Sequence, residues 1–105
     1  MNDSLNRLEA TIAARRGGDP TSSYVAKLSA AGRAKIAQKV GEEAVETVIA
    51  AMAGDPAKLT SEAADLMFHL LILLADGGIT LADVAAELDR REGVSGLTEK
   101  AARGE

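Results

Sequence analysis

The sequence predicts an all-α fold, in which the helices pack as a bundle. Three observations support this class: alanine is abundant, runs of β-branched residues are few, and charged residues recur at helical spacing. The 105 residues suit one compact domain spanning 1–105. Hydrophobic residues make up 47% of the chain and aromatic residues only 2%, so the core of the bundle must be aliphatic.

Two helices are expected in the first third of the chain. Ser4 can cap the first of them, which carries a stripe of leucine and isoleucine and ends before Gly17. Residues 17–23, GGDPTSS, have the composition of a loop. Ser23 can then cap a short second helix over 24–31, which a glycine stops.

The middle of the chain predicts two long helices, over 33–53 and about 56–75. Only Gly54-Asp55-Pro56 separates them, with Asp55 as a cap and the proline in the first turn. So short a connection makes the two helices antiparallel neighbours. The stretch LMFHLLILL in the second one is apolar on all sides, which predicts a central, buried helix.

A last helix is predicted to run to about Glu92. Thr80 and Asp83 have the spacing of a capping box at its start, and Gly77-Gly78 ends the helix before it. Four residues give it an inward apolar stripe: Leu81, Val84, Ala85 and Leu88. The tail that follows, GVSGLTEKAARGE, has no strong periodicity.

Two groups of carboxylates are expected to face each other across the long helix pair. Glu42, Glu43 and Glu46 lie within roughly a 100° arc of the first long helix. Counted at about 1.5 Å per residue from the connection, they reach the same height as Glu62 and Asp65 on the next helix. The valines around the first group, such as those at 45 and 48, are expected to be buried.

Carboxylates that converge between two buried helices cannot all stay charged without a cation. Oxygen ligands alone select a hard ion such as Mg²⁺ or Mn²⁺ rather than Zn²⁺. The alternative is an acidic helix face that simply points into water.

The pattern EExxE followed by ExxD resembles the metal motif of the all-α nucleoside triphosphate pyrophosphatases, the MazG-like superfamily. Three longer stretches are similar to the phosphoribosyl-ATP pyrophosphatase family of histidine biosynthesis: SSYVAKLSAAGRAKIAQKVGEEAVE, EAADLMFHLLILL and RREGVSGLTEKAAR. The similarity covers Leu5 to Arg103. Phe68 departs from it, since tyrosine is expected there, but the change removes no ligand. No cyclohydrolase domain is attached, so only the pyrophosphatase step is expected.

The resemblance implies hydrolysis of 1-(5-phosphoribosyl)-ATP to 1-(5-phosphoribosyl)-AMP and pyrophosphate, the second step of histidine biosynthesis. It implies four metal ligands, Glu43, Glu46, Glu62 and Asp65, with Mg²⁺ as the ion and Mn²⁺ as a substitute. Glu42 would hold a second ion or orient a metal-bound water. Cysteine is absent and histidine occurs once, so a metal-assisted direct displacement by water is the simplest mechanism.

Candidate substrate-binding residues each have a plainer structural alternative. Lys39 either forms an ion pair along its helix or binds a phosphate, and Lys27 and Lys35 are weaker candidates for the same role. Ser23 either caps its helix or helps to bind an anion there. Tyr24, the one tyrosine, either stacks on the adenine or packs against the first helix. If Tyr24 only stacks, its replacement by phenylalanine is expected to be nearly silent.

His69 and the C-terminal tail complete the list of candidates. His69 is better explained as a hydrogen-bonded histidine of the core than as a general base, although it could orient Asp65. Lys100 and Arg103 belong to a basic set near the C-terminus. The resemblance implies that SGLTEKAAR contributes to phosphate binding or to a subunit contact, within its own chain or across a dimer.

Two other functions remain open on the sequence. A MazG-like pyrophosphatase acting on another nucleoside or deoxynucleoside triphosphate would have the same fold and metal. A non-enzymatic helical module could use the acidic strip to bind a basic partner, without any metal. The longer similar stretches favour phosphoribosyl-ATP as the substrate.

The apolar surface and the charge of the chain bear on its partners. The helix over 66–74 is apolar on more faces than one short chain can cover, which predicts a homodimer that completes the bundle. The net charge of −4 argues against broad nucleic-acid binding. The longest apolar run is too short to span a membrane and the N-terminus does not resemble a signal peptide, so a cytoplasmic protein is expected.

Overall fold

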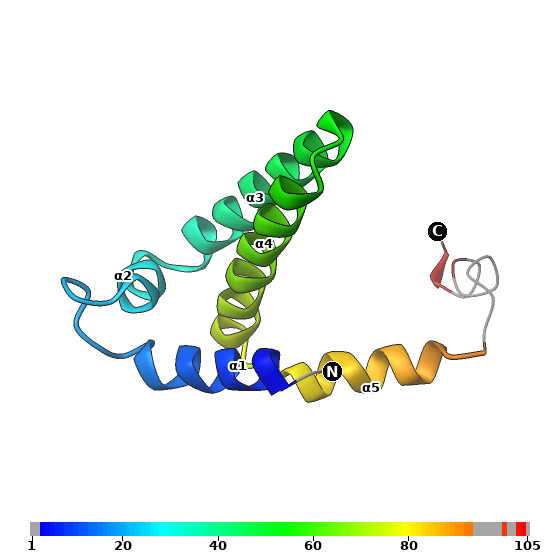
Figure 1. Ribbon diagram of the computed structural model, residues 1–105. Helices are drawn as coiled ribbons and strands as arrows, with labels where there is room; N and C mark the ends of the chain where they lie inside the picture. The colour runs from blue at the N-terminus through cyan, green and yellow to red at the C-terminus, as the bar shows by residue number, and fades with distance from the viewer. Residues whose placement is uncertain (1–2, 94–99, 101–102, 105) are drawn as a thin grey trace.

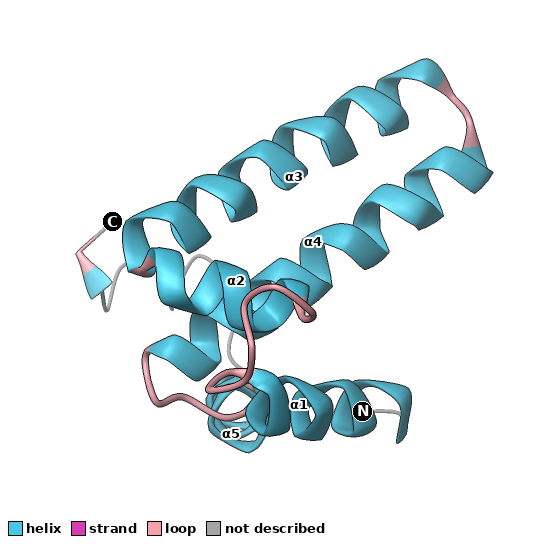
Figure 2. Ribbon diagram, turned by 90° about the vertical axis from the view of Figure 1, so that its left-hand side faces the viewer, coloured by secondary structure: helices cyan, strands magenta, loops and turns pink. Residues whose placement is uncertain are grey.

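The computed structural model describes residues 3–93, 100 and 103–104. Over these residues it contains helices and no strand, as predicted. The helices are α1 (Asp3–Arg15), α2 (Tyr24–Ala31), α3 (Arg33–Ala53), α4 (Pro56–Asp76) and α5 (Leu81–Arg91). Helices α3 and α4 form an antiparallel hairpin, α1 crosses the lower end of α4, and α5 leads away from that end (Figure 1, Figure 2).

The helix ends confirm most of the capping predictions. Ser23 Oγ accepts a hydrogen bond from the N–H of Ala26 at 3.2 Å at the start of α2. Asp55 Oδ1 accepts from the N–H of Lys58 at 3.2 Å at the start of α4. The predicted capping box is present at the start of α5, where the Thr80 and Asp83 side chains each bind the other's backbone N–H. These caps satisfy N–H groups that have no partner within their helices.

Three helix ends differ slightly from the prediction. The expected cap at Ser4 is wrong, because α1 begins at Asp3 and Ser4 lies inside the helix. The carboxylate of Asp3 in the first turn is favourable beside the positive end of the helix dipole. Helix α4 runs one residue further than expected, to Asp76, and α5 ends one residue earlier, at Arg91.

The aliphatic core lies around the lower half of α4. Its buried members come from all of the first four helices: Ile12, Val25, Leu28, Ile36, Leu71 and Ile72. The upper half of the α3–α4 hairpin stands clear of the other helices (Figure 1). The expectation that Val45 and Val48 are buried is therefore wrong for a single chain, in which both side chains are exposed.

Asp76 ties three helices together at the base of the hairpin. Its carboxylate accepts a hydrogen bond from Arg33 Nε at 2.7 Å, and its backbone carbonyl accepts one from Arg33 Nη2 at 2.9 Å. Arg16, just after α1, lies 3.5 Å from the same carboxylate. Glu9 of α1 accepts from the N–H of Leu81 at 2.7 Å, which satisfies a free donor at the start of α5. The base is thus joined by polar contacts as well as by the core.

No single helix among the described residues is long and apolar enough to cross a membrane. Helices α4 and α5 meet that requirement only when counted together, across a bend of 103°.

We expect Ile72→Ala to lower the free energy of unfolding by about 2–5 kcal/mol, because it opens a cavity at the centre of the bundle. Chemical denaturation followed by far-ultraviolet circular dichroism measures the change. Ile79→Ala is the matched control, since its side chain is exposed and should cost much less. Equal losses at the two positions would contradict the placement of the core.

Candidate metal centre

Three carboxylates from two helices meet inside the hairpin. Glu43 of α3 and the pair Glu62 and Asp65 of α4 each offer one oxygen, and these oxygens lie within 4.8 Å of one another. Glu43 is only 7% exposed, although it is charged at neutral pH in water. Glu62 is half-buried and Asp65 is exposed. The group therefore has a buried end and an end open to solvent.

Two oxygens of this cluster are buried without a hydrogen-bond donor among the described residues. These are Glu43 Oε2 and Glu62 Oε2. The other oxygen of each carboxylate has a lysine near it: Lys39 Nζ lies 3.8 Å from Glu43 Oε1, and Lys58 Nζ lies 3.4 Å from Glu62 Oε1. A buried anionic oxygen without a partner is costly. A hard cation between the three carboxylates would satisfy both oxygens, and an all-oxygen donor set fits Mg²⁺ or Mn²⁺.

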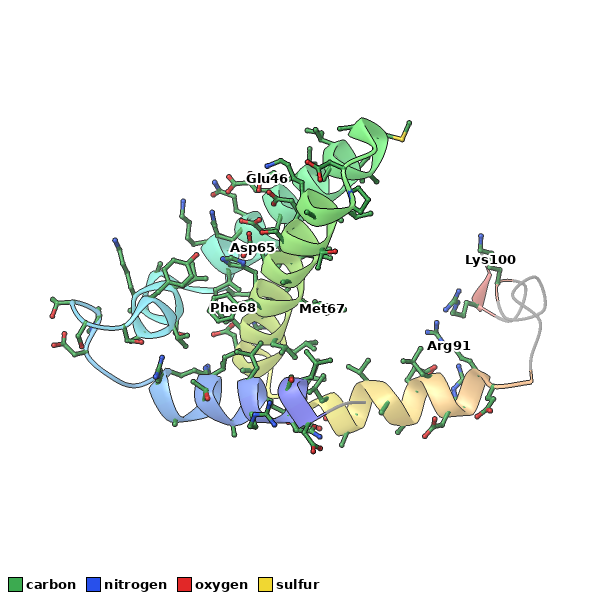
Figure 3. The ribbon with its side chains drawn as sticks, in the orientation of Figure 1. Glu46, Asp65, Met67, Phe68, Arg91 and Lys100 are labelled. Atoms are coloured by element: carbon green, nitrogen blue, oxygen red, sulfur yellow. The ribbon has the colours of Figure 1, made fainter. Side chains whose placement is uncertain are left out.

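The structure does not bring Glu42 and Glu46 into this group of three. Glu42 is engaged elsewhere: its Oε2 accepts a hydrogen bond from Gln38 Nε2 at 2.9 Å, and its Oε1 lies 3.4 Å from Lys39 Nζ. These contacts, first that with Gln38 and then that with Lys39, lower the pKa of Glu42. Glu46 is exposed and lies nearer the hairpin loop than Asp65 does (Figure 3). Both border the cluster without belonging to it.

Lys39 links the cluster to a groove between α2 and α3. The hydrogen bond to Glu42 is the main cause of the raised pKa of Lys39, and the charge of Glu43 adds to it. The groove has a volume of ≈ 290 Å³ and is lined by Tyr24, Lys27, Lys35, Lys39 and Glu42, among others. The three predicted lysines therefore face one space, next to the acidic cluster. Such a space favours a ligand with several negative charges.

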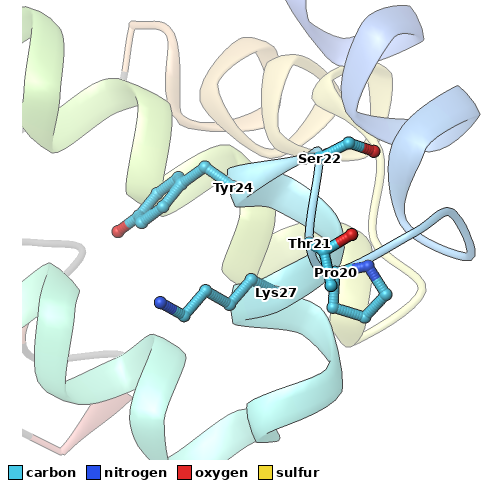
Figure 4. Close-up of a pocket in the computed structure, with 6 residues that line it drawn as sticks. Pro20, Thr21, Ser22, Tyr24 and Lys27 are labelled. Carbon is cyan, nitrogen blue, oxygen red and sulfur yellow. The ribbon is translucent and has the colours of Figure 1, made fainter.

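A second cavity is also lined by Tyr24. It has a volume of ≈ 570 Å³ and is lined by Tyr24, Lys27 and residues 20–23 (Figure 4). Ser23 also lines it, but its hydroxyl oxygen accepts the capping hydrogen bond described above. Tyr24 and Lys27, one turn apart on α2, border both spaces and extend to the same side of the helix (Figure 4).

Tyr24 and His69 meet although they are 45 residues apart. The Tyr24 hydroxyl lies 2.7 Å from His69 Nε2, and His69 Nδ1 lies 2.7 Å from the backbone oxygen of Asp65. His69 is buried, as expected for a hydrogen-bonded histidine of the core. Tyr24 is expected either to stack on the adenine or to pack against the first helix; within the chain its ring stacks on Phe68 of α4.

Two features of the site were missed by sequence reasoning. Lys58 lies beside Glu62, and its spacing of four residues on one helix could have revealed it. The Tyr24–His69 contact joins two helices, and no pattern within one helix predicts it.

The C-terminal tail holds two of the predicted residues, Lys100 and Arg103. Lys100 lies beyond the end of α5, well apart from Asp65 in the same chain (Figure 3). Arg103 follows it by three residues, and most of SGLTEKAAR lies outside the described residues.

A family model and several curated relatives match this chain over most of its length, and their descriptions agree. A family model described as phosphoribosyl-ATP pyrophosphohydrolase matches residues 5–92. A protein of Rhizorhabdus wittichii called phosphoribosyl-ATP pyrophosphatase is 69% identical over 103 residues, which cover 98% of this chain and 97% of the relative. Proteins of the same name from Erythrobacter litoralis and Novosphingobium aromaticivorans are 64% and 67% identical, covering 98% and 94% of this chain and 99% and 92% of the relatives.

The unpaired oxygens predict a metal-dependent stability that Glu43 controls. We expect saturating Mn²⁺ to raise the melting temperature by roughly 10 °C, because it binds only the folded chain. Glu43→Gln should abolish this rise and leave the metal-free protein as stable or more stable, since it removes a buried negative charge. Differential scanning fluorimetry with and without Mn²⁺ measures both effects.

Glu87→Gln is the matched control for this experiment. Glu87 lies on α5 among Arg90 and Arg91, which lower its pKa to about 2. Its loss should leave the Mn²⁺-induced rise intact. A rise that survived Glu43→Gln would show that the cluster does not bind the metal.

Proposed function

Because the chain belongs to the phosphoribosyl-ATP pyrophosphohydrolase family, we propose that its cluster of Glu43, Glu62 and Asp65 is the metal centre of this reaction. The reaction hydrolyses 1-(5-phosphoribosyl)-ATP to 1-(5-phosphoribosyl)-AMP and pyrophosphate, the second step of histidine biosynthesis. The observation that carries the proposal is the pair of buried carboxylate oxygens that lack a donor among the described residues. The centre also opens beside a groove with three lysines, as a polyphosphate substrate requires.

The donor set indicates which residues would hold the ion. Glu43, Glu62 and Asp65 would bind Mg²⁺ directly, and Glu46, three residues further along α3 than Glu43, is the fourth proposed ligand. When bound, Mg²⁺ supplies positive charge for the triphosphate and lowers the pKa of the attacking water. Glu42 stays ionised because of its contacts with Gln38 and Lys39, so it can orient that water or help to hold a second ion. Mn²⁺ is expected to substitute for Mg²⁺.

The lysines of the groove would bind the phosphates. Lys39 lies 3.4 Å from Glu42 and 3.8 Å from Glu43, distances that leave its ammonium able to turn towards a phosphate. Once a cation neutralises Glu43, Lys39 loses part of its attraction to that carboxylate. Lys27 and Lys35 line the same groove and would bind phosphate oxygens further from the metal. Water attacks a phosphorus, the phosphoric anhydride bond breaks, and pyrophosphate leaves.

The alternative functions fit the site less well. An acidic module for a basic partner could use the exposed Glu46 and Asp65, but it gives no reason for Glu43 to be buried against other carboxylates. A pyrophosphatase for an ordinary nucleoside triphosphate would use the same metal centre. The match over residues 5–92 favours phosphoribosyl-ATP as the substrate. A cytoplasmic location remains a prediction that accompanies this biosynthetic role.

We also propose that a second copy of the chain covers the exposed apolar face of the hairpin. Four large side chains of α3 are exposed in one chain: Val45, Val48, Ile49 and Met52. A further apolar groove of ≈ 140 Å³ lies where α1, α4 and α5 meet. Pairing about a two-fold axis would bury these surfaces against their own copy. It would also let Lys100 and Arg103 of one chain serve the site of the other.

The substrate is tested by pyrophosphate release from phosphoribosyl-ATP, dATP and dCTP, each with and without Mg²⁺. We expect Mg²⁺-dependent release from phosphoribosyl-ATP in large excess over the other two. Asp65→Asn should reduce kcat by at least about a hundredfold with the helical content intact, because it removes one charged ligand. Near-normal Mg²⁺-dependent turnover in this variant would refute the proposed centre.

The homodimer is tested by sedimentation equilibrium at micromolar concentration. We expect twice the chain mass of 10.8 kDa for the wild type. Val48→Glu should give the single-chain mass, because pairing would bury its charge in an apolar interface. Ala14→Glu, on the exposed side of α1, is the control and should remain dimeric. A single-chain mass for the fully active wild type would refute the dimer.

A further inference from the structure

Tyr24 joins the substrate groove to the helix that carries the metal centre. It is the first residue of α2, and its side chain borders both cavities described above. Tyr24 as a whole is 47% exposed, yet its hydroxyl reaches the buried His69 of α4. Tyr24 thus lines the two cavities with its exposed part and places its hydroxyl inside the bundle.

The hydrogen bonds at His69 allow a single arrangement of protons for the neutral ring. The backbone oxygen of Asp65 can only accept, so His69 Nδ1 must donate to it across 2.7 Å. The neutral imidazole then carries no proton on Nε2, which must accept. The Tyr24 hydroxyl therefore donates to Nε2 across 2.7 Å. Because His69 is only 6% exposed, water cannot easily replace this donor.

The ring of Tyr24 is also held by packing against α4. It stacks on Phe68, with centroids 6.1 Å apart and planes at 24°. His69 meets both rings edge-on, with centroid distances of 5.7 Å to Tyr24 and 5.3 Å to Phe68. The packed side of Tyr24 therefore has a defined position, and the exposed side presents a fixed surface to the cavities.

We infer that Tyr24 is a positioning residue for the substrate: its hydroxyl, bound to His69, fixes the start of α2 against α4. This fixes the exposed face of the ring and Lys27, which extend to the same side of α2 (Figure 4), in the groove that Lys39 and Glu42 also line. The contact acts on the groove and not on the metal ligands, because His69 binds the backbone oxygen of Asp65 and not its carboxylate. The inference rests on the proposed function and adds a role for the hydroxyl that ring stacking alone does not need.

Tyr24→Phe tests this role, because it keeps the ring and removes only the donor. We expect KM for phosphoribosyl-ATP to rise roughly tenfold, with kcat within about twofold of the wild type. The Mn²⁺ concentration at the midpoint of the thermal shift should stay unchanged. Ile12→Val is a control for lost stability: it weakens the shared core without removing the Tyr24–His69 contact and should leave KM unchanged.

A double-mutant cycle with His69→Leu separates positioning from general damage. If the hydrogen bond carries the effect, the double variant should have about the same KM as either single variant, so the two changes are not additive. Tyrosine emission gives a second measure, since the chain has one tyrosine and no tryptophan. Phosphoribosyl-ATP should change the emission of the wild type, and His69→Leu should shift this change to higher ligand concentrations.

Results that overturn the role of Tyr24 can be told apart from a failure of the proposed function. An unchanged KM in Tyr24→Phe, with only a lower melting temperature, would overturn the inference in favour of a purely structural contact. Additive effects on KM in the cycle, or a large loss of Mn²⁺ affinity, would also overturn it. If the wild type released no pyrophosphate from phosphoribosyl-ATP, the proposed function would fail first, and this inference would fail with it.

Discussion

The burial of carboxylates between α3 and α4 is the interaction on which the site depends. Glu43 and Glu62 each have a buried oxygen without a donor among the described residues. The nearby ammonium groups lie 3.4–3.8 Å from their other oxygens, so they neutralise the pair only in part. The hairpin can hold this arrangement because its ends are secured elsewhere: by Asp55 at the loop and by Asp76 at the base. The site is thus built at a cost that the rest of the fold offsets.

The distribution of apolar contacts explains why the site lies where it does. The core surrounds the lower half of α4, and no third helix among the described residues packs against the upper half of the hairpin. Glu43 lies between these regions: its own side chain is buried, and most residues of α3 that follow it towards the loop are exposed. The cluster is open to solvent at the exposed Asp65, so a ligand can approach it there. At the buried Glu43 the protein excludes water, and the local dielectric constant is low. Electrostatic interactions with a cation and with phosphates are stronger in such a place than in water.

Much of this architecture could be predicted from the sequence, because caps and glycines mark helix ends locally. The connection at Gly54 predicted two long antiparallel helices. The constant rise per residue then predicted that their carboxylates lie at the same height above that connection. The sequence pattern does not fix how each helix is rotated about its axis, and this rotation decides which carboxylates face the partner helix. For this reason the five carboxylates could not be ranked, although Glu43 faces inward and Glu46 outward. The link from Tyr24 to His69 depends on tertiary packing, which no spacing within one helix encodes.

The position of Lys39 shows how the metal centre and the groove depend on each other. Its ammonium lies among Glu42, Glu43 and the space lined by Lys27 and Lys35. Without a cation the acidic cluster attracts it, and the pKa of Lys39 is raised mainly by Glu42. A cation held by the proposed ligands would weaken the attraction of Glu43 for the ammonium of Lys39, which would leave Lys39 freer to bind a phosphate in the groove. Metal and substrate should therefore bind with positive coupling, since each reduces the charge that would oppose the other.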